Sequence, residues 1–254
     1  MLRKEFMAGK LSVKIYDSRK AMGEASGKEA GAYIRDLLSK KDEIYIIFAA
    51  APSQNEFLET VSNEPGIDWG RIHAIHMDEY VNLDPKHPAG FGNFLRRAIF
   101  DHHKFASIDY IGTDPDYEAT LKRYDAILAA HKPDICFMGI GENGHIAFND
   151  PHVANFHDPL RIKRVDLDPV CRQQQVNDGC FASLDEVPLY ALTLTIPTLM
   201  SSDRIFCVVP APSKTNAATT AVLGPVEEKC PASLLKTHPG ATLYLDSDSG
   251  KNLL

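Results

Sequence analysis

The residues of this chain best suited to acid–base chemistry are a histidine and several carboxylates that follow apolar, strand-like runs. His145 lies after a glycine-interrupted turn, with Asn143 and Asp150 close by in the sequence. A carboxylate that accepts a hydrogen bond from one ring nitrogen fixes the tautomer and leaves the other nitrogen free to exchange protons. The alternative is a purely structural histidine, but the polar neighbours at the end of a buried strand favour a catalytic site.

A second acidic group, Asp78-Glu79, ends the apolar stretch Trp69–Met77. A carboxylate in this position is either a surface residue of a turn or a general base at the rim of a pocket. Because side chains alternate along an extended segment, only one of the two acids should point into a site. The sequence leaves open which one it is.

Three further residues could hold an anion. Ser53 opens a helix after a strand-like run, where free backbone N–H groups and the hydroxyl would suit a phosphate. Lys214 lies at a second strand-to-helix turn, and Arg172 lies in an irregular region. The alternatives are a plain helix cap for Ser53 and solvated surface charges for the two cations. The alanines at 49–51 weaken the anion interpretation, because alanine resists the positive φ that many phosphate loops use.

A metal site is an alternative interpretation of the histidines in this stretch. His145, Asp150, His152 and His157 are close in sequence, but no pair has the helical HxxxH or HExxH spacing, and Pro151 interrupts any helix between them. We therefore predict no metal ligands here.

Strand-like and helix-like segments alternate along the chain, which predicts a single α/β domain over residues 1–254 with a mostly parallel sheet covered on both faces. Residues 151–190 show no sustained period and are predicted to be loop-rich, with one or two short strands. The expected strands are 11–16, 44–51, 69–77, 108–111, 135–138, 190–195, 205–209 and 241–245, the last closing the sheet, and the expected helices are 19–38, from 52, 89–103, 117–131 and 213–222.

Composition excludes several classes of protein. With 44% apolar residues the 254-residue chain can bury a full core. A net charge of −7 argues against non-specific binding to nucleic acid or to an anionic membrane. Five cysteines without CxxC pairing, no apolar leader and no run of 18 apolar residues lead us to expect reduced thiols and a cytoplasmic location.

Two motifs give the chain a family resemblance. They are His76–Val81 (HMDEYV) with the following His87-Pro88, and Gly139–Pro151 (GIGENGHIAFNDP). With these motifs the chain resembles the glucosamine-6-phosphate deaminase (isomerase) family, within the larger group that also contains the 6-phosphogluconolactonases. The likeness runs from about Ser18 to Leu245. Lactonases differ in the second motif, where a small polar residue follows Gly-His and the Ala-Phe-Asn-acid ending is absent.

The resemblance implies a Rossmann-like three-layer α/β/α sandwich that converts an aldose amino-sugar phosphate to a ketose phosphate and ammonia. Asp78 would move a proton from carbon 2 to carbon 1, and His145, supported by Asn143 and Asp150, would open the sugar ring. The phosphate would be held by three residues, Ser53, Arg172 and Lys214. No redox cofactor and no metal is implied, since protons are only relocated.

The sequence departs from the commonest family pattern in four places. Ala49-Ala50-Ala51 replaces a glycine-rich turn, Asn143 stands where many members have aspartate, and Asp150 stands where glutamate is usual. The serine pair of an allosteric site is absent at residues 152–154, although Arg161 and Lys163 resemble its cationic part. We therefore predict no allosteric activation.

Three functions remain as hypotheses at this point. The first is the deaminating isomerase, with glucosamine 6-phosphate as the first candidate substrate and galactosamine 6-phosphate as its nearest alternative. A sugar-phosphate lactonase would use the same histidine to activate water, and a non-catalytic sugar-phosphate sensor is the third hypothesis. The expected partner is thus a small amino-sugar phosphate, and a homo-oligomer is left open.

Overall fold

Apolar runs rich in β-branched and aromatic residues form a central eight-stranded sheet in the computed structural model, which describes residues 1–254. The strand order is β1-β2-β11-β10-β7-β3-β4-β6, and every neighbouring pair is parallel except β1 with β2. The strands are β1 (Leu2–Ala8), β2 (Leu11–Tyr16), β3 (Ile44–Phe48), β4 (Ile72–His76), β6 (Ser107–Asp109), β7 (Ile135–Met138), β10 (Arg204–Val209) and β11 (Ala241–Leu245).

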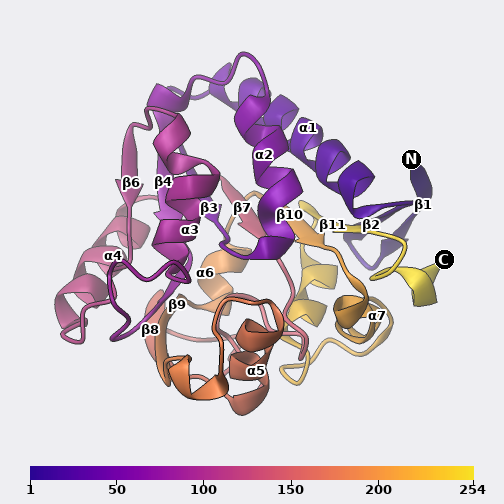
Figure 1. Ribbon diagram of the computed structural model, residues 1–254. Coiled ribbons are helices and arrows are strands. Elements are labelled where there is room, and N and C mark those ends of the chain that lie inside the picture. The colour runs from indigo at the N-terminus through magenta and orange to yellow at the C-terminus, as the bar shows by residue number, and fades with distance from the viewer.

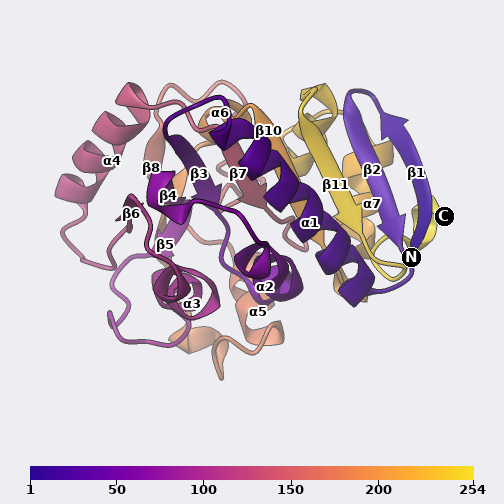
Figure 2. The ribbon, with the colours of Figure 1, turned by 90° about the horizontal axis from the view of Figure 1, so that it is seen from above.

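Helices cover both faces of this sheet, as Figures 1 and 2 show. One face packs against α1 (Arg19–Leu38), α2 (Asn55–Asn63) and α3 (Phe91–Ala98). The other packs against α4 (Glu118–Ala130), α6 (Ile196–Met200) and α7 (Thr215–Leu223). The two apolar clusters contain 34 and 35 buried residues, so the sheet is covered about equally on its two sides. This arrangement confirms the predicted three-layer α/β/α architecture.

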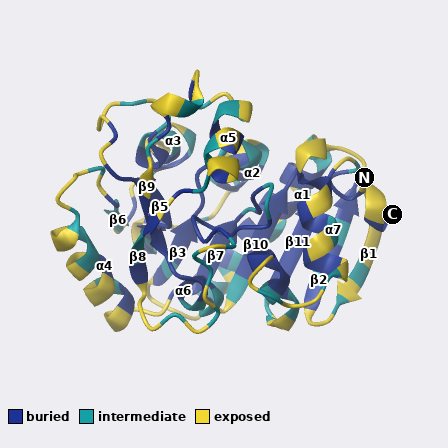
Figure 3. Cartoon of the chain, turned by 90° about the horizontal axis from the view of Figure 1, so that it is seen from below, coloured by how far each residue is buried: buried dark blue, intermediate teal, exposed yellow.

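The burial pattern explains why the central strands are continuous apolar runs. Ile135–Met138 is buried at every position, because a parallel strand in the middle of the sheet faces helices on both sides. Figure 3 shows the inner strands as buried, whereas the edge strand β1 and the outer side of α4 carry exposed residues. None of the helices combines the length and the apolar composition that a membrane-spanning helix needs.

Helix α1 is fixed at its start and along one side by local chemistry. The Ser18 hydroxyl accepts a hydrogen bond from the Ala21 N–H and caps the helix, as the sequence predicts. Gly23, Gly27 and Gly31 then face α2, and a Cβ atom at any of them would lie within 2.7 Å of an α2-side atom. Since only glycine allows this close approach, α1 sets the position of α2 and of the turn that precedes it.

A second, smaller sheet was not predicted. Its strands are antiparallel in the order β5-β9-β8, with β5 (Asp78–Tyr80), β9 (Tyr190–Leu194) and β8 (Ile162–Asp166). The chain leaves the main sheet after His76 and enters the small sheet at Asp78. Asp78 therefore lies at the junction of the two sheets.

Two expectations for the elements were wrong. Residues 151–190 hold a regular helix, α5 (Pro169–Asn177), besides β8. Strand β11 does not close the sheet at an edge but lies between β2 and β10. Strand order depends on long-range pairing, which the local apolar pattern does not contain.

Candidate active site

A cavity of about 360 Å³ opens where β3, β4, β7 and β10 end, and it contains the strongest candidates for chemistry. Its lining includes Ser53, Asp78, His145 and Lys214, four residues that the sequence analysis singled out separately. The carboxyl ends of parallel strands meet at one edge of the sheet, which is where ligands bind in open α/β folds. Asp78 and His145 thus share one cavity, as the enzyme hypothesis requires.

His145 is held by two side chains of its own loop. Its Nδ1 atom lies 2.8 Å from Asn143 Oδ1 and 2.9 Å from Asp150 Oδ1, and the Asn143 Nδ2 group donates to Asp150 Oδ1 at 2.9 Å. A proton on Nδ1 satisfies these oxygens and leaves Nε2, which has no partner in the protein, as the nitrogen able to accept a proton. Gly141 makes room for the ring, because a Cβ atom there would lie 2.1 Å from it.

Asp150 and its surroundings form the floor beneath His145. The Asp150 side chain is fully buried, which opposes ionisation, but hydrogen bonds from His145 and Asn143 outweigh this and lower the pKa of the carboxyl. The shorter side chain of aspartate therefore reaches the histidine. The thiol of Cys171, kept protonated by the raised pKa that burial causes, lies beside the same carboxylate.

Asp78 and Glu79 point in different directions, as strand alternation predicts. Asp78 lines the cavity and makes no side-chain hydrogen bond, whereas Glu79 accepts hydrogen bonds from the N–H groups of Phe91 and Gly92 at the start of α3. Burial, together with the neighbouring Glu79, raises the pKa of Asp78 well above its ordinary value. A cavity carboxyl with a raised pKa has the property that a general base near neutral pH needs.

The residues predicted to bind an anion are only partly brought together. Ser53 and Lys214 line the cavity, and the Lys214 side chain, in a residue only 5% exposed, makes no hydrogen bond or ion pair to the protein. Burial lowers the pKa of its ammonium group. Two arginines that were not predicted, Arg19 and Arg97, also line the cavity, and each donates to a backbone carbonyl.

Arg172, the third residue predicted to hold the phosphate, does not line the cavity. Its guanidinium donates to the carbonyls of Leu184 and Val187, away from the cavity. Arg172 is on the first turns of α5, and the side of the helix that carries it faces the loop after it. The guanidinium therefore fixes that loop to α5.

The backbone angles of the turn before Ser53 are ones that alanine can adopt. Ala49, Ala50 and Ala51 line the cavity, and Ala51 is extended with φ −162°. None of the three has a positive φ, so this turn does not need glycine. Positive φ angles occur instead at Ala147 (47°) and Ala211 (86°), which also line the cavity, so backbone strain is concentrated there.

Helix α5 contributes cavity residues that the sequence analysis missed, namely Gln174 and Gln175. A readable signal was present, because Asp168 followed by Pro169 is an N-cap residue with proline in the first turn. In the structure Asp168 Oδ1 accepts from the Cys171 N–H at 2.7 Å. The other carboxylate oxygen lies 3.4 Å from Asn143 Nδ2, so the start of α5 is linked to the histidine loop.

The structure brings possible metal ligands together in two clusters. Ligand atoms of His145, Asp150 and Cys171 lie within 4.8 Å of one another, and so do those of Asp150, His152 and Asp168. Sequence spacing did not reveal the Cys171 cluster, because that residue comes from another element. In the first cluster, however, the histidine nitrogen and the carboxylate are already hydrogen-bonded to each other. His157 belongs to neither cluster.

Comparisons with known proteins identify the family of the chain. The family model described as "Glucosamine-6-phosphate isomerases/6-phosphogluconolactonase" matches residues 17–244. A glucosamine-6-phosphate deaminase of Bacillus cereus (strain B4264) is 35% identical over 185 residues, covering 72% of this chain and 68% of the relative. The corresponding protein of Bacillus cytotoxicus is 31% identical over 242 residues, covering 94% and 88%.

Solved structures give the same result. A monomeric glucosamine-6-phosphate deaminase superimposes with a TM-score of 0.81 at 25% identity, covering 94% of this chain and 98% of the other. A 6-phosphogluconolactonase from Thermotoga maritima shares the fold, with a TM-score of 0.75 at 18% identity and coverage of 92% and 98%. The resemblance drawn from the two motifs is confirmed, and the chain belongs to the family of glucosamine-6-phosphate isomerases and 6-phosphogluconolactonases.

Proposed function

We propose that this protein isomerises and deaminates an amino-sugar 6-phosphate, giving a ketose 6-phosphate and ammonia. The observation that carries the proposal is the shared cavity, in which a buried carboxylate and a histidine are accompanied by an unpaired lysine. The deaminases among the relatives, at 31–35% identity, favour this reaction over others of the family. Glucosamine 6-phosphate is the first candidate substrate and galactosamine 6-phosphate the second.

The reaction begins with ring opening, which suits His145. The pyranose ring opens when the C1 hydroxyl loses its proton and the ring oxygen gains one, giving an open-chain aldehyde. A histidine with Nδ1 held by Asp150 and Asn143 and with Nε2 unpartnered can carry that proton. Asn143 and Asp150 act through His145 and orient it.

Proton transfer between adjacent carbons then suits Asp78. The carboxylate removes the proton from C2, the electron pair forms a C1–C2 double bond, and the aldehyde oxygen takes up a proton. The same proton returned to C1 leaves a C2 iminium ion, to which water adds before ammonia departs. The raised pKa of Asp78 supports both halves of this step, since the group must accept a proton and give it back.

The far end of the substrate carries the phosphate, for which Lys214 and Ser53 are the proposed partners. Lys214 is a buried cation with no counter-ion in the protein, so a bound phosphate would supply the missing charge. The Ser53 hydroxyl lies at the turn before α2 and can donate to a phosphate oxygen. Arg172 has no part in this proposal.

The test is a panel of hexosamine 6-phosphates assayed for both ammonia and ketose phosphate. Glucosamine 6-phosphate or galactosamine 6-phosphate should release the two products in equal amounts. A parallel assay measures hydrolysis of 6-phosphogluconolactone, the substrate expected for a lactonase. Lactone hydrolysis without ammonia release would replace the proposal by the lactonase alternative, and binding without either reaction would favour the sensor.

A further inference from the structure

Three consecutive glutamines of α5 lie in three different surroundings. Gln173 is exposed to solvent, and its Nε2 group donates to Asn177 on the same helix at 3.1 Å. Gln174 and Gln175 are buried, with exposures of 7% and 6%, and both line the cavity. One side chain type thus occurs at three adjacent positions, which allows a comparison within a single helix.

The Gln174 side chain is hydrogen-bonded within the protein. Its Oε1 atom accepts a hydrogen bond from the Glu142 N–H at 2.9 Å, and its Nε2 group lies 3.4 Å from an Asp178 carboxylate oxygen. The first of these bonds joins α5 to the loop that carries His145. Gln174 therefore positions the helix against the catalytic loop.

The Gln175 side chain has no hydrogen-bond partner within the protein. Its carboxamide makes no hydrogen bond to any part of the protein, although the residue is 94% buried and lines the cavity. Neither of its polar atoms is among the fully buried unpartnered atoms, so both keep access to the cavity, and the donor and the acceptor of the carboxamide are available to a bound molecule. Among the buried polar residues that line this cavity, Asp78 and Lys214 share this property, and both have a proposed role toward the substrate.

We propose that Gln175 is a specificity-determining residue that binds a hydroxyl group of the sugar chain. This inference rests on the proposed function. A carboxamide offers both a donor and an acceptor, which matches a hydroxyl group that also donates and accepts. Phosphate at neutral pH is mainly an acceptor and calls for cations, and Lys214 is already available for it.

The position of Gln175 in the fold supports the assignment of the hydroxyl group to Gln175 and of the phosphate to Lys214. Asp78 and His145 come from strand ends of the sheets, and Lys214 comes from the turn before α7, whereas Gln175 comes from α5. Figure 1 shows α5 below β7 and β10, beside the small sheet. The helix therefore brings to the cavity a neutral group that neither the proton-transfer residues nor the lysine supplies.

The test measures binding without turnover, by titration calorimetry with two probes. Glucitol 6-phosphate carries the hydroxyl chain but has no carbonyl group to isomerise, and inorganic phosphate carries the anion alone. For the Gln175→Leu variant we expect roughly tenfold weaker binding of glucitol 6-phosphate and unchanged binding of phosphate. The matched control Gln173→Leu, on the exposed side of the same helix, should bind both probes as the wild type does.

Three outcomes would overturn the inference. These are wild-type affinity of Gln175→Leu for glucitol 6-phosphate, an equal loss of both probes, and absence of glucitol 6-phosphate binding to the wild type. Thermal unfolding shows whether Gln175→Leu folds. If Gln175→Leu does not fold, Gln175→Asn replaces it; this variant withdraws the carboxamide by one methylene and should show the same selective loss of glucitol 6-phosphate binding. Wild-type binding of glucitol 6-phosphate without ammonia release from any hexosamine phosphate overturns the proposed function alone.

Discussion

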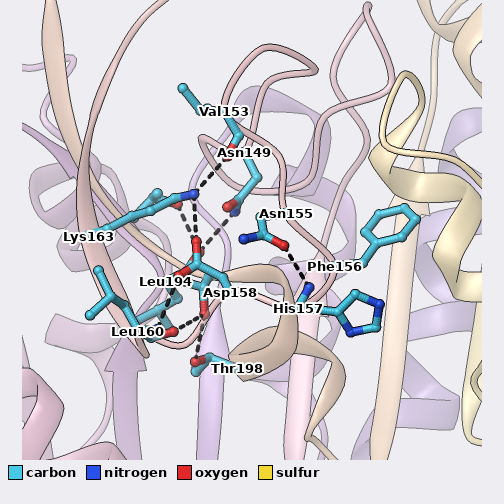
Figure 4. Close-up of polar contacts among 12 residues, drawn as sticks. Asn149, Val153, Asn155, Phe156, His157, Asp158, Leu160, Lys163, Leu194 and Thr198 are labelled. Carbon is cyan, nitrogen blue, oxygen red and sulfur yellow. Dashed lines mark hydrogen bonds and ion pairs between the residues drawn. The ribbon is translucent and has the colours of Figure 1, made fainter.

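Two lysines with little exposed surface, Lys163 and Lys214, lie in opposite situations. Lys163 on β8 is 14% exposed at its side chain and donates to Asp158 at 2.8 Å and to the Val153 carbonyl at 2.7 Å, as Figure 4 shows. Lys214 at the cavity is buried, with 5% of the residue exposed, but it has neither a carboxylate nor a carbonyl partner. The loop before β8 supplies the counter-charge of the first lysine, and nothing in the fold supplies that of the second.

The comparison separates structural charges from those available to a ligand. Taking a charge out of water is unfavourable unless partners replace the lost hydration. The Lys163–Asp158 pair meets this condition within the chain, so it fixes the loop before β8 to that strand. Arg161 is likewise paired with Asp125 at 3.0 Å, so both Arg161 and Lys163, the cations that the sequence analysis compared with an allosteric site, have acidic partners within the protein.

The largest effect is expected at the unpartnered carboxylate of the cavity. Asp78→Asn keeps the shape but cannot accept a proton, so ammonia release should fall by roughly 10³-fold or more. Steady-state assay of ammonia measures this, with calorimetry showing that glucitol 6-phosphate still binds. Turnover at the wild-type rate would remove Asp78 from the mechanism.

The same variant has a signature in stability. Because the pKa of Asp78 is raised in the folded state, the folded protein binds this proton more tightly than the unfolded chain does. The unfolding free energy of the wild type therefore loses a contribution as pH rises above about 4. Asp78→Asn lacks this loss, so its stability relative to the wild type should increase between pH 5 and pH 8 in urea unfolding.

The next largest effect tests the paired lysine. Asp158→Asn leaves the ammonium of Lys163 enclosed without its counter-charge and should lower the unfolding free energy by about 3 kcal/mol. Ammonia release should change little, since neither residue lines the cavity. The control is Asp125→Asn, which breaks the exposed pair with Arg161 and should cost less than about 1 kcal/mol. Equal losses of unfolding free energy in the two variants would contradict the difference between an enclosed and an exposed ion pair.

A third change concerns Asn143, which has protein partners although it supports the cavity histidine. Its Nδ2 group lies between the carboxylates of Asp150 and Asp168, so Asn143→Asp removes a donor and places a third negative charge there. We expect a loss of about 2 kcal/mol at pH 7.5 and a smaller one at pH 4.5, because repulsion raises the carboxyl pKa values and protonation relieves it. Urea unfolding at both pH values measures this, with the exposed Asn155→Asp as control.

The smallest effect is expected for the unpaired lysine. Lys214→Met should raise KM for the sugar phosphate about tenfold, through loss of a charge-assisted contact, while the unfolding free energy stays the same or increases. Burial lowers the pKa of Lys214, so the wild type gains stability as pH rises from that lowered pKa toward 10.5, and the variant should lack this gain. A marked destabilisation by Lys214→Met would show that the lysine has a structural role after all.

Much of the fold could be predicted from local pattern. The apolar run 135–138, the serine cap before α1 and the alternation of strands with helices all depend on neighbouring residues, and each is as predicted. Helix α5 was missed although its Asp168-Pro169 start is a local signal, because the polar glutamines after it show no clear apolar face. The small sheet could not be predicted, since its three strands come from distant parts of the chain.

The sequence by itself determined which residues end the strands and therefore which side chains reach the carboxyl edge of the sheet, among them Asp78, His145 and Lys214. Tertiary structure alone decided which charges keep partners. Arg172 and Lys214 are both isolated cations in the sequence, yet Arg172 meets two carbonyls of a loop 12 and 15 residues away and Lys214 meets none. The reason is physical, because a residue's own chemistry is local, whereas its partners are brought to it by the folding of the whole chain.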